Sequence, residues 1–308
     1  MIRARMPPMK LAILGVPTSI GARNRGTEKA PGVLRSAGLL DRLLSRGHDA
    51  LDLGDQEEIP YSPDPDPSRE SCQNLPGVLA MARTLAGRVE AALRDGRRLL
   101  ILGGDCTVAL GSFAGITRVH PEAGLAYLDR DAELNTPRTS QSGILDGMVI
   151  AHLLGRGAPE LARMEARFPL LRPGRLALLG IQRLDPQEVP IFEALPALRV
   201  MATDAKRLGA ASVARETLRR VAPGDGAFHV HLDLDVLDGA AIPAVDFPAP
   251  GGLGLDEAGV FLREMAANAG FLGMEVTNYN PDRDPGGDVA AKVVELIDRA
   301  LGPAGGAS

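Results

Sequence analysis

The sequence has few of the features that mark several large classes of protein. It contains only two cysteines, Cys72 and Cys106, which argues against a disulfide framework and favours a reducing, cytoplasmic location. No apolar run approaches the ~20 residues of a membrane-spanning helix. The basic leader MIRARMPPMK has no apolar core of signal-peptide length. We therefore expect a cytoplasmic protein without a membrane partner.

Concentrated positive charge is also missing. The 308 residues include 34 Lys and Arg against 39 Asp and Glu, which gives a formal net charge of -5. Nucleic-acid binding needs a basic face, and no segment supplies one, so we expect no nucleic-acid partner. What the sequence does have is a composition that is 45% hydrophobic and 24% charged, which is typical of a globular protein with a substantial core.

Strand-like and helix-like segments alternate along the chain. Strands are predicted at 10–16, 48–55, 97–104, 124–129, 175–181, 197–203, 227–235 and 271–276, and helices at 33–45, 77–96, 107–117, 146–154, 186–194, 208–221, 255–269 and 286–301. This alternation is typical of a parallel sheet with helices on both faces.

One proline-rich polar segment, 56–72, does not interrupt the alternation, and we interpret it as a surface loop. We predict an α/β fold: a single three-layer α-β-α domain over residues 1–308, with a mainly parallel, doubly wound sheet. Residues 1–9 and 303–308 are expected to be frayed ends.

Acidic, thiol and imidazole groups follow or end three of the predicted strands. These groups are Asp105 and Cys106, then Asp129, Asp131 and Glu133, and then His231, Asp233 and Asp235. Each cluster alone also fits a helix N-cap, a buried cysteine or a solvated loop. However, the carboxyl ends of parallel strands meet at one edge, and so many acids repel one another without a counter-ion. The sequence therefore predicts a site for metal ions or a cationic substrate.

These clusters lie in segments that resemble the ureohydrolase family of arginases, agmatinases and their relatives. The resemblance covers nearly the whole chain and includes residues 10–40, the GGD turn, the LNTP and SG segments, LDLDVLDG, PGGLGLDEA and GMEV. It implies the arginase-like fold, with two divalent ions, manganese in the family, at the carboxyl edge of the sheet. It also implies a homotrimer or homohexamer.

The family's metal-ligand positions fall on six residues of this chain: Cys106, Asp129, Asp131, Glu133, Asp233 and Asp235. In the family a histidine follows the GGD turn, and the next cluster reads Asp-x-His-x-Asp. Here both histidines are replaced and one aspartate is lengthened to glutamate, yet every replacement can bind a cation. A thiolate is a softer ligand than manganese usually meets, so Cys106 leaves zinc or iron open.

His231 faces the same side as the predicted ligands, where the family usually has a small polar residue. Two interpretations stay open. It is either a core histidine bonded to the backbone, or an imidazole that replaces a lost one, as a metal ligand or as a donor to a ligand.

The resemblance also implies the contacts of an amino-acid substrate. Asn135, Ser140 and Ser142 match the positions that hold its α-carboxylate. Asp185 and Glu188 match the acids that receive its α-amino group. An ordinary role at a helix N-cap or a turn would also fit Asp185 and Ser142.

The predicted catalytic residues are Glu275 and Asp146. Glu275 in GMEV matches the carboxylate that pairs with the planar guanidinium. Asp146 stands where arginases have a histidine proposed to move protons. A carboxyl group can act as a general acid only if its pKa is raised, which neighbouring anions can do.

Two functions are compatible with this sequence. The first is a metal-dependent C–N hydrolase that acts on the guanidine group of arginine or a close analogue such as N-hydroxyarginine and releases urea or a substituted urea. The second is a non-catalytic pseudo-arginase, an amino-acid-binding or regulatory subunit, in which Arg130, Arg138 or Arg183 neutralises the acids. Complete replacement by ligand-capable groups favours the first function, and loss of three histidines favours the second.

Overall fold

A single eight-stranded sheet forms the centre of the protein in a computed structural model that describes residues 7–62 and 72–302. The strand order is β2-β1-β3-β8-β7-β4-β5-β6, and every neighbouring pair is parallel. The strands are β1 Lys10–Val16, β2 Asp49–Asp55, β3 Arg98–Gly103, β4 Gly124–Leu128, β5 Leu176–Ile181, β6 Leu198–Met201, β7 Phe228–Asp233 and β8 Phe271–Thr277. The predicted α/β fold with a parallel sheet is confirmed.

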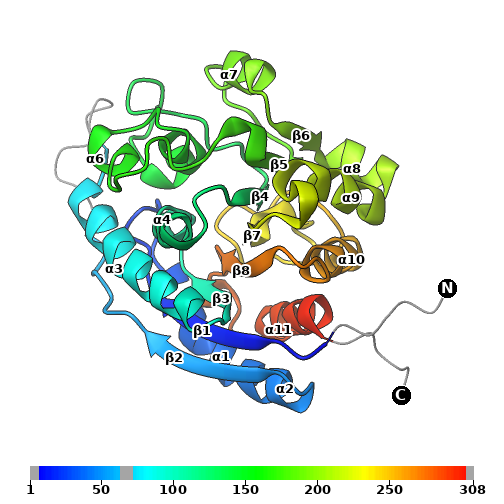
Figure 1. Cartoon of the computed structure of the whole chain (residues 1–308). Helices are drawn as coiled ribbons and strands as arrows, with labels where there is room; N and C mark the ends of the chain where they lie inside the picture. The colour runs from blue at the N-terminus through cyan, green and yellow to red at the C-terminus, as the bar shows by residue number, and fades with distance from the viewer. Residues whose placement is uncertain (1–6, 63–71, 303–308) are drawn as a thin grey trace.

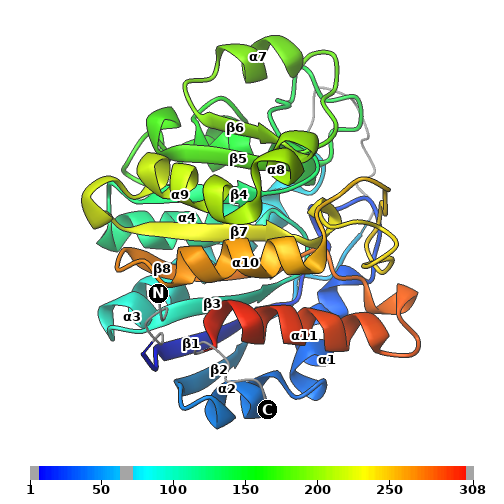
Figure 2. The ribbon, with the colours of Figure 1, turned by 90° about the vertical axis from the view of Figure 1, so that its right-hand side faces the viewer.

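Helices cover both faces of this sheet, because its inner strands are apolar on both sides. In β1, Leu11 and Ile13 enter one hydrophobic core, whereas Ala12 and Leu14 enter the other. The first core is covered by α1 Ala30–Ser36, α2 Leu39–Ser45, α8 Ala202–Leu208, α9 Ala210–Val221, α10 Leu255–Ala266 and α11 Asp288–Leu301 (Figures 1 and 2). The second is covered by α3 Leu75–Arg94, α4 Val108–Val119, α5 Val149–Leu153 and α6 Pro159–Ala162, while α7 Val189–Ala194 lies beyond β5 and β6 (Figure 1).

Four neighbouring strands, β3, β8, β7 and β4, bring the predicted site together. The chain leaves β3 and skips two strand positions before it enters β4, and β7 and β8 later fill these positions. Because the strands are parallel, all four carboxyl ends meet at one edge of the sheet. Segments far apart in sequence therefore supply one site.

Some predicted boundaries were wrong. The helix expected at 33–45 is split into α1 and α2, because Gly38 adopts a left-handed φ of 85° that ends a regular helix. The end of the strand expected at 197–203 is helical, since α8 begins at Ala202. The helix expected at 146–154 starts as a 3-10 turn, η2 Leu145–Met148, before α5.

The ends of the described segments also differ from expectation. Met9, assigned to a frayed end, is buried, and its N–H donates to Nδ1 of His48 at 3.0 Å. Residues 1–6 and 303–308 lie outside the described residues, as do residues 63–71 of the loop predicted at 56–72. In the part of the chain that is described, no helix is long and apolar enough to cross a membrane.

Candidate metal centre

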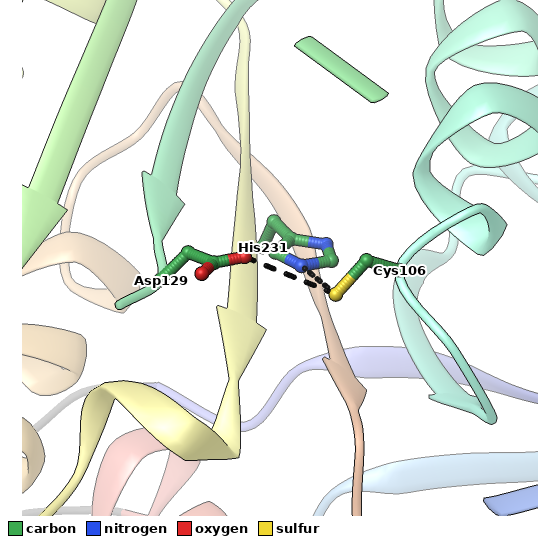
Figure 3. Close-up of side chains that lie close together, drawn as sticks. All are labelled: Cys106, Asp129 and His231. Atoms are coloured by element: carbon green, nitrogen blue, oxygen red, sulfur yellow. Dashed lines mark hydrogen bonds between the residues drawn. The ribbon is translucent and has the colours of Figure 1, made fainter. Parts of the chain in front are cut away.

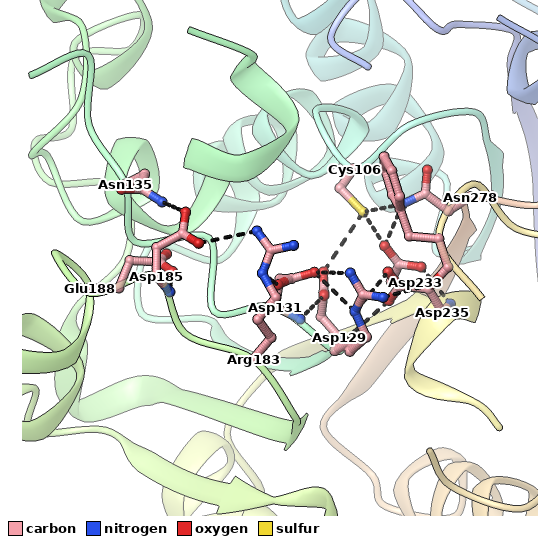
Figure 4. Close-up of polar contacts among 12 residues, drawn as sticks. Cys106, Asp129, Asp131, Asn135, Arg183, Asp185, Glu188, Asp233, Asp235 and Asn278 are labelled. Carbon is pink, nitrogen blue, oxygen red and sulfur yellow. Dashed lines mark hydrogen bonds and ion pairs between the residues drawn. The ribbon is translucent and has the colours of Figure 1, made fainter. Parts of the chain in front are cut away.

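Four buried residues form what we call the inner group: Cys106, Asp129, Glu133 and Asp233. One ligand atom from each lies within 4.8 Å of the others. Asp233 ends β7, Cys106 and Asp129 follow β3 and β4 (Figure 4), and Glu133 lies further along the loop after β4. A thiol and three carboxylates in this arrangement fit a divalent cation, since they supply four ligand atoms and more than enough negative charge.

Local backbone geometry places these side chains. The GGD turn after β3 needs glycine at position 104, because a Cβ there would lie 1.7 Å from the carbonyl oxygen of Thr18. Asp105 then bonds to the N–H groups of Gly21 and Thr107, at 3.0 and 2.9 Å, and so fixes the loop that presents Cys106. Asp105 is not the N-cap of α4, however, because Thr107 occupies that position and makes no side-chain cap bond.

The second acidic cluster does not stay extended as the alternating pattern implied. Glu133 has a positive φ of 50°, which turns its carboxylate back towards the sheet. The hydroxyl of Tyr127 donates to Oε2 of Glu133 at 2.5 Å. Glu133 therefore joins the inner group although the chain has left β4.

A second cluster, the outer group, consists of Asp129, Asp131 and Asp235, again with ligand atoms within 4.8 Å. Asp235 lies past the end of β7, in the 3-10 turn η5 Leu234–Val236, so the strand predicted at 227–235 stops earlier than expected. The turn carries Asp235 towards Asp131 and away from the inner group. Asp129 belongs to both groups and links them.

The outer group is in contact with two arginines. Arg130 pairs with Asp131 at 2.9 Å and with Asp235 at 3.9 Å. Arg183 pairs with the other oxygen of Asp131 at 3.2 Å and with Asp185 at 3.1 Å. Among the described residues, no lysine or arginine forms an ion pair with Asp129, Glu133 or Asp233. Within the two groups, the arginines therefore pair only with the two acids that belong to the outer group alone.

His231 lies between the inner group and a buried carboxylate. Its Nε2 atom is 3.3 Å from Sγ of Cys106 (Figure 3), and its Nδ1 atom is 2.8 Å from Oε1 of Glu275. The ring also stacks on Tyr127 with the centroids 4.0 Å apart. The ring nitrogens therefore bond to side chains, unlike those of the core histidine in the first interpretation, which bonds to the backbone. This arrangement fits the second interpretation, an imidazole next to the predicted metal ligands.

Burial and mutual repulsion perturb the acids of both groups. Burial, followed by Asp233 and Glu133, raises the pKa of Asp129 well above its ordinary value. Burial, followed by Asp131, raises the pKa of Asp235 to about 6. Acids whose pKa is raised for want of a counter-charge are suited to bind a cation that displaces their protons.

A cavity of about 300 Å³ opens next to the two groups, a volume typical of small-molecule sites. Nine of its lining residues are acidic and three are arginines, so the cavity favours a cation or a cationic ligand. All five predicted substrate-binding residues line it, namely Asn135, Ser140, Ser142, Asp185 and Glu188. Asn135 donates to Oδ2 of Asp185 at 3.0 Å, which ties two of these positions together.

Asp146 also lines the cavity, close to the inner group. Its Oδ1 atom accepts the backbone N–H of Cys106 at 2.7 Å. Burial, followed by the nearby Asp105, raises the pKa of Asp146 well above its ordinary value. The condition that the sequence set for a general acid at this position is met.

Glu275 does not reach the cavity. It is fully buried within β8, with its two oxygens facing His231 at 2.8 Å and His229 at 3.6 Å. Burial alone would raise its pKa, but the two histidines lower it to about 2. The predicted contact with a substrate guanidinium is therefore corrected, because the carboxylate contacts His229 and His231 and does not line the cavity.

Asn278 is the residue that lies at the cavity in the same region, and sequence reasoning missed it. It follows β8 with a positive φ of 63°, and its amide donates to Asp233 and, at 3.4 Å, to Cys106. Its position could have identified it, because it directly follows a parallel strand and residues at the carboxyl ends of such strands line the binding site.

Comparison with known proteins agrees with this architecture. Residues 9–302 match the arginase family. The chain belongs to the arginase family. It is 32% identical to the arginase of Bacillus subtilis over 293 residues, which cover 95% of this chain and 97% of that protein. It is 33% identical to human arginase-1 over 301 residues, which cover 94% and 90%.

Solved arginase structures share the fold as well. The arginase of Bacillus caldovelox superposes with a TM-score of 0.88 at 30% identity, covering 96% of this chain and 98% of that one. The proclavaminate amidino hydrolase of Streptomyces clavuligerus has a TM-score of 0.73 at 20% identity, which shows a common fold alone. Membership of the arginase family places the chain among the metal-dependent ureohydrolases, and the predicted family is confirmed.

Proposed function

We propose that the protein hydrolyses a C–N bond in the guanidine group of arginine or a close analogue such as N-hydroxyarginine and releases urea or a substituted urea. The observation that carries this proposal is the contact between a metal-binding group and an acidic cavity of amino-acid size. A guanidinium and an α-ammonium are both cations, and this cavity offers carboxylates along its length.

In this proposal the inner group holds a divalent ion, whose chemistry is to polarise the guanidine and to activate a water. The chain's own residues orient the substrate. Asn135, Ser140 and Ser142 bind the α-carboxylate, and Asp185 binds the α-amino group. Asp146, whose pKa is raised by burial and by the nearby Asp105, is the carboxyl group that gives a proton to the leaving amine.

The outer group is the second cation position that family resemblance predicts. Manganese is the ion of the family, whereas the sulfur of Cys106 favours zinc or iron at the inner group.

We also propose a single domain, a cytoplasmic location and a homotrimer or homohexamer, as the resemblance implies.

Metal analysis and a urea-release assay test this function together. Protein purified without chelator is analysed for bound metal and then assayed on arginine and N-hydroxyarginine with Mn, Zn or Fe supplied. We expect bound metal and turnover, and we expect Asp129→Asn to lose at least about 100-fold in rate. Asp95→Asn, at an exposed residue outside the site, serves as the control. Absence of both metal and turnover would refute the proposal.

A non-catalytic pseudo-arginase is the second candidate, and the ion pairs of Arg130 and Arg183 with Asp131 favour it. In such a protein, arginines would neutralise the acids and the cavity would bind an amino acid without cleaving it. Calorimetry with arginine separates the two candidates, because binding without urea release supports the second.

A further inference from the structure

The positively charged guanidinium of Arg130 lies next to the acids of the outer group. We propose that its guanidinium, and not a second metal ion, is the permanent cation of the outer group, so that each chain holds one metal ion, at the inner group. This inference rests on the proposed function only in taking the inner group as a metal site.

The side chain of Arg130 reaches both acids that belong to the outer group alone. Its Nη2 and Nε atoms lie 2.9 and 3.2 Å from Oδ2 of Asp131. Nε also lies 3.9 Å from Oδ2 of Asp235, and the backbone N–H of Arg130 donates to Oδ1 of Asp235 at 3.3 Å. One residue therefore contacts both carboxylates through main chain and side chain.

The guanidinium is also held in place and shielded from water. Its Nη1 atom donates to the carbonyl oxygen of Phe247 at 2.7 Å, on the opposite side from Asp131. The side chain of Arg130 is only 9% exposed. A guanidinium stays charged at every accessible pH, and its planar fork loses little freedom when both ends are bonded. Arg130 is thus a fixed buried charge and not a surface residue that swings freely.

Both carboxylate oxygens of Asp131 already contact an arginine. Arg130 contacts Oδ2, and Nε of Arg183 lies 3.2 Å from Oδ1. A divalent ion bound here would have to break these bonds and would then lie close to two guanidinium groups of like charge. Both consequences disfavour a metal ion at the outer group.

The inner group differs from the outer group in having no positively charged side chain among its close partners in the described part of the chain. Its ligand atoms include the sulfur of Cys106, and its close partners are Tyr127, His231 and Asn278, which carry no fixed positive charge. In residues 7–62 and 72–302 no lysine or arginine forms an ion pair with Glu133 or Asp233. Among these residues the inner group therefore has no fixed positive side chain paired with it, and a metal ion that displaces its protons can supply the missing positive charge.

Counting bound metal in four proteins tests the inference. Each is saturated with Mn or Zn, freed of excess ion and analysed by elemental analysis. We expect one ion per chain in the wild type and two in Arg130→Met, which keeps an unbranched apolar stem and removes the charge. Arg138→Gln, at an exposed arginine of the following loop, is the matched control and should keep one.

Asp235→Asn gives a second test that does not depend on the folding of Arg130→Met. If the outer group holds no metal, this variant keeps one ion per chain. Electron paramagnetic resonance of the Mn-loaded wild type should give the spectrum of isolated ions and not of coupled pairs. Two ions in the wild type, a coupled spectrum, or a folded Arg130→Met protein with one ion would overturn the inference.

Urea release is measured separately, so that the two proposals can fail independently. One ion per chain without turnover leaves this inference standing and removes the hydrolase function. Two ions with turnover do the opposite.

Discussion

The thiol of Cys106 is in direct contact with the carboxylate of Asp233, with Sγ 2.9 Å from Oδ2. Burial, followed by Asp233 and Glu133, raises the pKa of the Cys106 thiol well above its ordinary value. Without a metal ion the thiol therefore keeps its proton, whereas only the thiolate binds a metal. Metal binding at the inner group must release that proton, which couples metal affinity to pH.

Cys106→Ser should lose the preference for soft metals. A hydroxyl is a poor substitute for a thiolate towards zinc or cobalt, but it costs less towards manganese. With Co(II) as a probe, the wild type should show a sulfur-to-cobalt charge-transfer band that the variant lacks. Cys72→Ser, at the other and partly exposed free cysteine, should keep the band. A band that survives Cys106→Ser would remove this residue from the metal site.

His231→Ala should weaken metal binding by about 10-fold or more, as loss of a ligand or of a ligand's partner does. Glu275 is ionised and accepts from Nδ1–H of His231, which leaves the lone pair of Nε2 facing Cys106. Isothermal titration with Zn measures the change. His120→Ala, at the end of α4, is the control. Unchanged affinity in His231→Ala would assign the residue to the core alone.

Much of the site could be predicted because parallel strands end at one edge. Cys106, Asp129 and Asp233 follow or end β3, β4 and β7, and the topology alone brings them together. Glu133 joins the inner group for a reason other than the alternation, since a positive φ turns it inwards.

What failed depended on single-residue geometry. Glu275 and Asn278 are only three positions apart, but the first lies inside β8 and the second follows its end. A pattern does not reveal on which residue a strand stops. The pairing of Arg130 with Asp131 was equally hidden, because neighbours in an extended chain point apart, and only the bend after β4 lets their side chains meet.

Removal of metal should destabilise the protein more at high pH than at low pH. The raised pKa values of Asp129, Glu133 and Asp233 mean that the folded metal-free protein binds protons that the unfolded chain has released. This proton binding stabilises the folded metal-free protein at low pH, and the stabilisation is lost as pH rises through the pKa values of the folded state. Metal binding, in contrast, becomes stronger as pH rises. The difference in melting temperature between loaded and chelated protein should therefore grow as pH rises above the ordinary carboxyl range of about pH 4. A constant difference would contradict this account.

His152 should make the fold sensitive to mild acid. It is buried on α5, where Nε2 accepts the N–H of Ala158 at 3.0 Å, and burial lowers its pKa to about 4. The unfolded chain binds a proton below about pH 6.5 and the folded chain does not, so stability falls as pH falls between these values. The loss is about 3 kcal/mol at most. Urea unfolding of wild type and His152→Gln at several pH values measures it, and equal slopes would show that His152 is not the cause.

Asp185 and Glu188, which the sequence assigned to the same ammonium group, should respond differently to mutation. Glu188 is only 3% exposed, and its two oxygens accept the N–H groups of Leu134 and Asp185 at 2.7 and 2.9 Å. It joins two loops and has little capacity left for a ligand. Asp185 keeps a side chain that is 29% exposed and faces the cavity.

Asp185→Asn should therefore raise KM for arginine roughly 10- to 100-fold with kcat nearly unchanged, because a charged contact made equally in the bound and transition states is lost. Glu188→Gln should instead lower the melting temperature with a smaller change in KM, since one backbone N–H loses its acceptor. Steady-state kinetics and thermal unfolding of both variants distinguish these effects, and calorimetric Kd values replace KM if turnover is absent. Equal KM effects in the two variants would mean that Glu188 also binds the substrate directly.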